Sequence, residues 1–253
     1  MDKLSPQSDF GVSVVVPVYE EAATIIELVA RLERLDMVRQ IVLVDDGSSR
    51  ETAELLDALP VDEKSTVVRH PENRGKGAAL RTGFAACREP IVVIQDADLE
   101  YVPEDLPKLV EPIAAGVADV VYGTRYHDAA DQTGRRRFRL ANWFLTALSN
   151  RLTGLRLSDM ETGHKAFRKE VLDSIEIVEN RFGVEPELTA KIARGNWRVA
   201  ETPIRYYPRS RAEGKKIGLR DGIRAVWCLW RYSRPTRREQ QPLMSATACS
   251  NES

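Results

Sequence analysis

Short apolar runs alternate with helix-like patterns along the first half of the chain. Four continuous runs, at 13–18, 41–44, 66–69 and 91–95, are rich in valine and isoleucine, which is typical of strands covered on both faces. From residue 25 to 35, apolar residues recur at spacings of three and four, as in an amphipathic helix. The alternation predicts an α/β fold in which helices cover both faces of a mostly parallel sheet.

Acidic turns follow three of these strands. Glu20 and Glu21 follow the first, Asp45 and Asp46 the second, and the segment 96–98 the fourth. Ligands of open α/β sheets bind where the carboxyl ends of the strands meet. We therefore expect the three turns to line one crevice.

The sequence Asp96-Ala97-Asp98 carries the strongest chemical signal. Successive side chains of a strand alternate between its faces, so the two carboxylates project to the same side. Close carboxylates repel each other, whereas a hard divalent ion favours the ionised form of both and also binds phosphate oxygens. The segment predicts a Mg²⁺ or Mn²⁺ site that holds a diphosphate; a solvated Asp-x-Asp turn is the alternative.

A glycine-rich loop, Asn73-Arg74-Gly75-Lys76-Gly77, precedes a predicted helix. It is not a Walker loop, because His70 stands where the first glycine is required and Gly77 follows the lysine. No glycine follows the first strand, which excludes a dinucleotide fingerprint. The loop offers backbone donors and a cation beside a helix N-terminus, so it is either an anion site or a helix cap.

Composition describes an ordinary globular chain. The 253 residues are 43% hydrophobic and 30% charged, and the formal net charge of −1 excludes a globally basic nucleic-acid binder. We expect one domain over residues 12–234, with polar tails at 1–11 and 235–253. Three scattered cysteines and three isolated histidines form neither a disulfide framework nor a zinc site. No apolar run has the length of a membrane span, so we expect a chain that is neither secreted nor integral.

Two later segments have the pattern of amphipathic helices with basic flanks. In the first, after the cationic run 135–139, apolar residues share one helical face and polar residues occupy the other. The apolar residues are Phe138, Ala141, Phe144, Leu145, Leu148 and Leu152. The second segment has Ile223, Val226, Trp227 and Trp230 at helical spacing among arginines. Both helices either lie in a membrane interface or pack on the sheet.

Several motifs occur in order along the chain. They are Val-Pro-Val-Tyr-Glu-Glu at 16–21, Val-Asp-Asp-Gly-Ser at 44–48, Asn-Arg-Gly-Lys-Gly-Ala-Ala at 73–79 and Asp-Ala-Asp-Leu at 96–99. The similarity continues through Tyr-Gly-Thr-Arg at 122–125, the segment 159–167 and Glu-Thr-Pro-Ile at 201–204. As a set, over residues 12–232, the chain resembles glycosyltransferase family 2 and, within it, the dolichol-phosphate mannosyltransferase-like, or polyprenyl-phosphate glycosyltransferase, branch.

The resemblance implies a GT-A fold, a nucleotide-sugar donor, a divalent metal and inversion at the anomeric carbon. It assigns eight residues to the donor site: Pro17, Tyr19, Glu21, Asp45, Asp46, Arg74, Lys76 and Asp96. It places Asp96 and Asp98 at the metal and sugar, with Glu100, where relatives often carry Gln, as a third ligand. The family's phosphate-binding role falls on Arg211 and Lys216.

Two residues and one segment depart from the family pattern. Glu20 stands where the family usually has Asn, so donor details differ. His164 replaces an aromatic residue, which either alters packing near the acceptor or sugar or is a tolerated ring exchange. The segment 211–217 lacks a serine and is one residue shorter than the family's segment.

The acceptor decides the mechanism. A phosphate monoester is largely ionised near neutral pH and needs no general base, whereas a sugar hydroxyl does. We expect Arg125, after the predicted strand 120–122, to clamp an acceptor phosphate with its guanidinium and to share the catalytic role with Asp98; a salt bridge is the alternative. If the acceptor is a hydroxyl, Glu185 or Glu187 becomes the candidate base.

The sequence as a whole predicts transfer of a hexose, mannose or glucose, from a GDP- or UDP-sugar to a polyprenyl phosphate. Two other functions stay open: a family 2 glycosyltransferase that acts on a sugar hydroxyl, and a non-catalytic GT-A scaffold that binds membranes or partners. If the chain transfers a sugar to a polyprenyl phosphate, we expect a cytoplasmic enzyme held peripherally at the inner face of a membrane, without a nucleic-acid partner. A membrane-protein partner or a homo-oligomer also fits this prediction.

Overall fold

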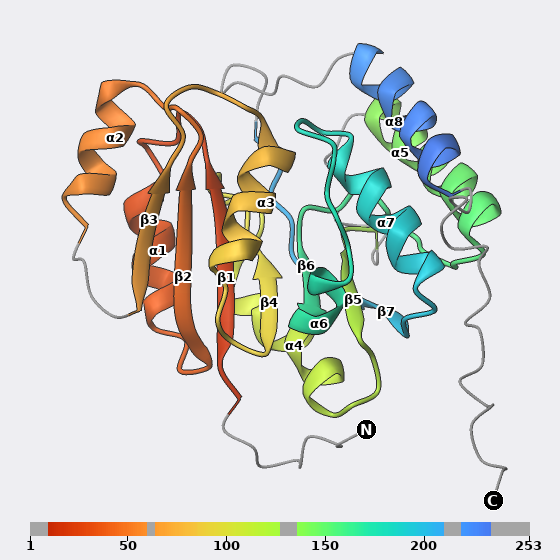
Figure 1. Cartoon of the computed structure of the whole chain (residues 1–253), viewed down its shortest axis with the longest axis horizontal. Helices are drawn as coiled ribbons and strands as arrows, with labels where there is room; N and C mark the ends of the chain where they lie inside the picture. The colour runs from red at the N-terminus through yellow and green to blue at the C-terminus, as the bar shows by residue number, and fades with distance from the viewer. Residues whose placement is uncertain (1–9, 60–63, 127–135, 210–218, 234–253) are drawn as a thin grey trace, which may run out of the picture.

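The computed structural model describes residues 10–59, 64–126, 136–209 and 219–233, and its centre is one mixed sheet (Figure 1). Within these residues the sheet has seven strands in the order β3-β2-β1-β4-β6-β5-β7. The strands are β1 (Val12–Val18), β2 (Val38–Asp45), β3 (Ser65–Arg69), β4 (Ile91–Ile94), β5 (Val120–Thr124), β6 (Lys165–Arg168) and β7 (Val199–Pro203). Of the predicted tails, residues 1–9 and 235–253 lie outside the described part of the chain.

The first four strands pair in parallel, as their continuous apolar runs predict. β7 is parallel to β5, whereas β6 runs antiparallel between β4 and β5. The sequence does not predict β6, because this strand has only four residues and a charged residue at each end. The arrangement confirms the predicted α/β fold with a mostly parallel sheet.

Helices cover both faces of the sheet (Figure 1). One face carries α1 (Ile25–Glu33), α2 (Arg50–Asp57) and α4 (Leu106–Ala114), which follows the short 3-10 helix η1 (Pro103–Asp105). The other face carries α3 (Lys76–Ala86), α6 (Lys169–Asp173) and α7 (Val184–Arg194). Alternate residues of β1 enter opposite cores, with Val14 and Val16 in one and Val15 in the other. Both faces of the central strands are therefore covered, and the acidic turns lie where these strands end.

Two further helices, α5 (Arg136–Thr153) and α8 (Leu219–Tyr232), pack against each other and against α7 (Figure 1). Both segments that the sequence pattern predicts as amphipathic helices are thus helical. Among the described residues, no helix combines the length and the apolar character needed to cross a bilayer.

The polar face of α5 points toward the protein. Asn142, Thr146 and Ser149 are buried, whereas Leu140 and Trp143 are 66% and 65% exposed. A helix that packs on a core in water normally has the opposite arrangement.

The predicted apolar face of α5 divides between the core and the outside. Leu145 and Leu148 are half-buried and pack against the core, while Phe144 and Leu152 are exposed. The side chain of Phe138 lies outside the described part. The helix therefore serves the core and the outer surface at once.

The second amphipathic helix, α8, also presents aromatic residues to the outside. Its core side is formed by Ala225, Cys228 and Leu229. Its exposed residues are those of the predicted apolar face: Ile223, Val226, Trp227 and Trp230. The two neighbouring helices thus carry an exposed apolar surface, which we call the α5–α8 surface and define by Leu140, Trp143, Phe144, Ile223, Trp227 and Trp230.

Candidate functional site

The ends of β1, β2 and β4 bring the three acidic turns together. Val18 and Asp45 are partners in the ladder between β1 and β2, and the Asp46 amide donates to Val18 O at 2.9 Å. The Gln95 amide donates to Val15 O at 3.0 Å, which aligns the end of β4 with β1. Because these strands are parallel, all three turns lie at the carboxyl edge of the sheet.

Asp46 holds the glycine-rich loop in place. Its carboxylate accepts hydrogen bonds from the backbone amides of Arg74 at 3.0 Å and Gly75 at 2.7 Å, and it lies 2.6 Å from His70 Nδ1. Asp45 in turn accepts a hydrogen bond from the Ser48 amide at 2.9 Å. In this structure the two aspartates shape the loops around the site, with Asp46 fixing the backbone that leads to Lys76.

The departure at Glu20 has a structural use. Glu20 has a φ of 58°, a left-handed conformation that non-glycine residues rarely adopt. Its carboxylate accepts hydrogen bonds from the amide and hydroxyl of Ser49 at 2.9 and 2.6 Å. These bonds tie the turn after β1 to the turn after β2.

Lys76 lies at the start of α3 between two carboxylates. Its Nζ is 2.8 Å from Asp96 Oδ1 and 3.1 Å from Glu185 Oε1, and Glu185 also pairs with the buried Lys165. Burial alone would lower the pKa of Lys76, but Asp96 and Glu185 raise it above its ordinary value. Burial would likewise raise the pKa of Glu185, yet Lys165 and Lys76 lower it. Lys76 and Glu185 are therefore held in their charged forms.

Asp98 forms no such ion pair with any of the described residues, although the charge of the nearby Arg209 acts to lower its pKa. Burial and the nearby carboxylates of Asp96 and Glu100 raise the pKa of Asp98 to about 7. The Glu100 amide donates to Asp98 Oδ1 at 3.0 Å, and Leu99 between them has a φ of 58°. A carboxylate in this setting is stabilised by any cation that reaches it.

Glu100 is engaged by a segment after β7. Its carboxylate accepts hydrogen bonds from the Tyr206 hydroxyl and, at 2.8 Å, from the Arg209 amide. Among the described residues, no three His, Cys, Asp or Glu side chains are grouped to hold a metal ion. To act as a third ligand, Glu100 would have to turn toward Asp98.

The donor set fits a hard divalent cation. Asp96 and Asp98 supply carboxylate oxygens, which Mg²⁺ and Mn²⁺ prefer, and burial together with the neighbouring carboxylates of Asp96 and Glu100 raises the pKa of Asp98, a setting that a bound cation would relieve. Mg²⁺ usually keeps waters and substrate phosphates as its other ligands, so two protein carboxylates suffice.

Arg209 is a site residue that sequence reasoning missed. Its guanidinium donates to the carbonyl oxygen of Asp98, with Nε at 2.9 Å, and lies 2.9 Å from Glu21 Oε2. It thus joins the turn after β1 to the segment after β4. In the sequence Arg209 is one of several arginines after β7, in a segment separated from Asp98 by more than a hundred residues.

Arg125 forms a buried ion pair. Its Nε and Nη2 donate to the two oxygens of Asp159 at 2.6 and 2.7 Å, and Asn142 of α5 donates to the same carboxylate at 3.0 Å. The guanidinium carbon lies 5.1 Å from the centre of the Tyr206 ring. The guanidinium is thus fixed at the carboxyl end of β5, and a phosphate that binds it would share it with Asp159.

Glu161 is a second residue that sequence reasoning missed. Its Oε1 is buried without a hydrogen-bond partner in the described part of the chain. Burial and the nearby charge of Glu185 raise the pKa of Glu161 to about 7. The motif around Asp159 was visible in the sequence, but the burial of this carboxylate depends on packing.

The substitution at His164 places a neutral ring in the core of the site. His164 is fully buried, its Nε2 lies 2.8 Å from Gln95 Oε1, and burial lowers the pKa of the ring to about 4. The ring centre lies 5.1 Å from that of Tyr101. His164 therefore packs as an uncharged aromatic group.

The remaining predicted residues occupy different settings. Pro17 is half-buried and Tyr19 is 40% exposed, both at the end of β1, and the exposed Arg74 begins the glycine-rich loop. Glu187 accepts hydrogen bonds from the amides of Val178 and Glu179, both at 2.8 Å, and pairs with Lys191. Glu187 thus anchors a loop instead of facing Lys76. Arg211 and Lys216 lie outside the described residues.

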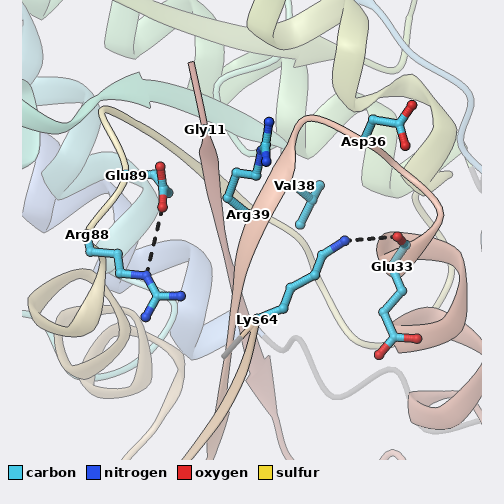
Figure 2. A pocket seen from close by; sticks show the side chains of 8 residues that line it. All are labelled: Gly11, Glu33, Asp36, Val38, Arg39, Lys64, Arg88 and Glu89. Carbon is cyan, nitrogen blue, oxygen red and sulfur yellow. Dashed lines mark hydrogen bonds and ion pairs between the residues drawn. The ribbon is translucent and has the colours of Figure 1, made fainter. Parts of the chain in front are cut away.

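A shallow, charged hollow lies at the opposite end of the sheet (Figure 2). Gly11 and Val38 at the amino ends of β1 and β2 line it, together with paired charges such as Arg88 and Glu89. It contains none of the predicted site residues. The acidic turns at the carboxyl edge stay the candidate site.

Comparison with known proteins identifies the family of this chain. Residues 13–176, which include the three acidic turns and the glycine-rich loop, match the family model described as glycosyl transferase family 2. Two similar curated proteins are undecaprenyl-phosphate 4-deoxy-4-formamido-L-arabinose transferases. The one from Sodalis glossinidius is 35% identical over 83% of this chain and 64% of its own length; the one from Edwardsiella ictaluri is 36% identical over 81% and 62%. The chain thus spans less than two thirds of the length of these relatives.

Solved structures share the fold. The glucosyl-3-phosphoglycerate synthase of Mycobacterium tuberculosis aligns with a TM-score of 0.68 and 27% identity, over 92% of this chain and 84% of that one. A complex of that synthase with Mn²⁺, UDP and phosphoglyceric acid aligns with the same TM-score at 23% identity, over 91% and 81%. The GT-A fold implied by the sequence motifs is thereby confirmed, and the chain belongs to glycosyl transferase family 2.

Proposed function

We propose that this protein transfers a glycosyl group from a nucleotide sugar to a polyprenyl phosphate, with inversion at the anomeric carbon. The observation that carries the proposal is the grouping of carboxylates and cations at one sheet edge, where Asp98 forms no ion pair among the described residues and Lys76 lies beside Asp96. The names of the curated relatives, which are undecaprenyl-phosphate sugar transferases, support the same lipid acceptor.

The donor binds along the ends of β1, β2 and β4 in this proposal. Pro17, Tyr19, Glu21, Asp45 and Asp46 surround the nucleoside, while Arg74 and Lys76 contact the diphosphate. Mg²⁺ or Mn²⁺, held by Asp96 and Asp98 with Glu100 as a further candidate, would neutralise the leaving diphosphate. Lys76 is already charged and lies close to Asp96. This supports a movement of its ammonium group from Asp96 to the phosphate oxygens when the donor binds.

The acceptor phosphate binds at Arg125 in this proposal, with Arg211 and Lys216 as further contacts. The Asp159 carboxylate keeps the guanidinium in one orientation, so little side-chain entropy is lost when a phosphate binds. The phosphate is already ionised and attacks without a general base. The work of the protein is then to align it with the anomeric carbon.

The α5–α8 surface supports a lipid acceptor. Exposed tryptophans together with Arg224 and Arg231 are typical of helices that lie in a membrane interface. We propose that this surface rests on the cytoplasmic leaflet of a membrane, peripherally, so that a polyprenyl phosphate reaches Arg125 from the bilayer. Each basic residue near an anionic leaflet contributes about 1 kcal/mol.

The identity of the sugar and of the nucleobase in the donor is a separate question. The sequence suggests a hexose, whereas the curated relatives are named for 4-deoxy-4-formamido-L-arabinose, a pentose derivative. A structural neighbour was solved with UDP, which favours a UDP-sugar over a GDP-sugar. We therefore propose a UDP-linked sugar and test hexose and amino-pentose donors side by side.

The test is incubation of purified protein with Mn²⁺, radiolabelled UDP-glucose, UDP-4-deoxy-4-formamido-L-arabinose or GDP-mannose, and undecaprenyl phosphate in detergent. Label should enter the organic phase only with metal and lipid phosphate present. Asp98→Asn should lower product formation by about 10²–10³-fold, while Arg50→Gln on the exposed side of α2 should leave it unchanged. A protein that binds the donor or liposomes but turns nothing over with any donor and acceptor is a scaffold, and the proposal then fails.

A second candidate is transfer to a hydroxyl acceptor, and Glu161 favours it. A buried carboxyl with a pKa near 7 and without a hydrogen-bond partner has the properties of a general base. Glu185 is a weaker choice because two lysines hold it ionised. This alternative is established if all labelled product is polar and the Glu161→Gln variant no longer forms it. If the acceptor is a phosphate, the Glu161→Gln variant should still transfer the sugar.

A further inference from the structure

The glycine-rich loop packs against a second segment that no sequence motif marks. The Ala78 amide donates to Asn180 O at 3.1 Å. A Cβ at Gly75 would lie 2.4 Å from Asn180 O, and one at Gly77 would lie 2.1 Å from Glu179 O. These two glycines are therefore required by the backbone of residues 179–180, which forms the outer wall of the loop that carries Lys76.

Further contacts join the same two elements. Arg81 of α3 donates to the side-chain oxygen of Asn180 at 2.9 Å and to Ile177 O at 3.1 Å. We call residues 177–180 the bracing segment. Its position determines where the first turn of α3, and hence Lys76, can lie.

The bracing segment is fixed from its other side by α8. The buried Glu179 carboxylate accepts hydrogen bonds from Arg224 Nε at 3.0 Å and Nη2 at 2.7 Å, and from the Tyr232 hydroxyl at 2.9 Å. Burial alone would raise the pKa of Glu179, but Arg224 and Tyr232 lower it. The Glu179 amide meanwhile donates to Glu187 of α7. The carboxylate is thus the point where α8 meets the bracing segment.

We propose that Glu179 is a positioning residue for nucleotide-sugar binding, which acts by tying α8 through the bracing segment to the glycine-rich loop. The proposal rests on the proposed function in assigning this loop to the donor. It adds that the arrangement of α8, far from Lys76 in the sequence, sets the affinity for the donor. The acceptor phosphate site at Arg125 does not share these contacts.

The test compares Glu179→Gln, which keeps the shape but loses the ion pair, with the wild type. Loss of hydrogen bonds to a charged group is expected to weaken binding of UDP with Mn²⁺ about tenfold and to raise the donor KM by the same factor. The kcat at saturating donor and the acceptor KM should change less than about twofold, because neither depends on the loop's resting position. Tyr232→Phe should give a smaller loss.

Three variants test the coupling itself. Arg224→Lys should restore part of the affinity that Arg224→Gln loses, and the double variant Glu179→Gln/Arg224→Gln should bind no worse than Glu179→Gln. Glu54→Gln removes an exposed ion pair on α2 and serves as the matched control. If the Glu179→Gln variant is less stable but binds the nucleotide with unchanged affinity, Glu179 is only structural and the proposal is wrong.

Hydrogen exchange separates this proposal from the proposed function. The Ala78 amide should exchange faster in Glu179→Gln than in the wild type, without any ligand, because its acceptor belongs to the bracing segment. If the wild type binds no sugar nucleotide, the proposed function fails while this readout still tests the coupling. If exchange at Ala78 is unchanged, the coupling is wrong even in a protein that binds donor normally.

Discussion

The carboxyl edge of β1–β4 and the α5–α8 surface place polar and apolar residues in opposite ways. Every valine, leucine and isoleucine of β1, β2 and β4 is buried, and acidic residues gather where these strands end. In α5 the polar residues Asn142, Thr146 and Ser149 are buried, whereas Leu140, Trp143 and Phe144 face outward. The first region follows the usual rule for a protein in water, and the second does not.

The inverted arrangement of α5 has a physical reason on its inner side. Asn142 donates to Asp159, the Met160 amide donates to the Thr146 hydroxyl, and Asn150 exchanges hydrogen bonds with the backbone of Leu157. The polar face therefore satisfies the loop that carries Asp159, the partner of Arg125. The inner face of α5 is polar because it forms hydrogen bonds to the loop that holds Asp159. The apolar residues of α5 are therefore left on its outer side.

The largest effect is expected at the carboxyl edge, from Asp98→Asn. The variant loses the charge that holds the metal and should lower kcat/KM by about 10²–10³-fold, as removal of one electrostatic contact to a developing charge commonly does. Transfer of label from donor to lipid measures it. Retention of more than half the activity would show that this edge is not the reaction centre.

The next effect concerns the α5–α8 surface. The double variant Trp227→Ala/Trp230→Ala should weaken binding to vesicles with anionic lipid roughly thirtyfold, or about 2 kcal/mol, because two interfacial aromatic rings are lost. Co-sedimentation measures the change. Val117→Ala, at an exposed apolar residue after α4, should have no effect. Equal binding of the wild type and the double variant would show that the surface does not face lipid.

Metal binding at the carboxyl edge should depend on pH, unlike lipid binding at the α5–α8 surface. Because the pKa of Asp98 is about 7 without metal, protons compete with the cation below that pH. The Mn²⁺ affinity should fall about tenfold per pH unit below 7 and level off above it, as measured by calorimetry.

The same shift affects the stability of the metal-free protein, with the opposite sign. Between pH 3.8 and about 7 the folded protein keeps a proton on Asp98 that the unfolded chain has released, so stability falls as the pH rises through this range. Asp98→Asn should remove this contribution. A stability that is flat in the wild type over the same range would contradict the assignment.

The smallest effect tests the inner face of α5. Asn142→Ala removes one hydrogen bond to the buried Asp159 and should lower the free energy of unfolding by about 1–2 kcal/mol, as measured in urea. Ala147→Gln, on the exposed side of the same helix, should change it by less than about 0.5 kcal/mol. If the two variants behave alike, the polar face of α5 contributes nothing to the site.

Several site residues could not be identified from the sequence because their setting depends on distant partners. Arg209 joins Glu21 and Asp98, which are far from it and from each other along the chain. The burial of Glu161 Oε1 and the contacts of Glu179 likewise depend on how separate elements pack. Local spacing contains no information about such contacts.

The sequence by itself determined the alternation of strands and helices, the acidic turns at the strand ends and the helical segments near the C-terminus. These features follow from local periodicity, since the geometry of a strand or helix sets which neighbouring residues share a face. Only the tertiary structure decided which partner each charge has, that Arg125 pairs with Asp159, and that α5 turns its polar face inward. These outcomes depend on the free energy of burying groups from distant segments together, which no short segment contains.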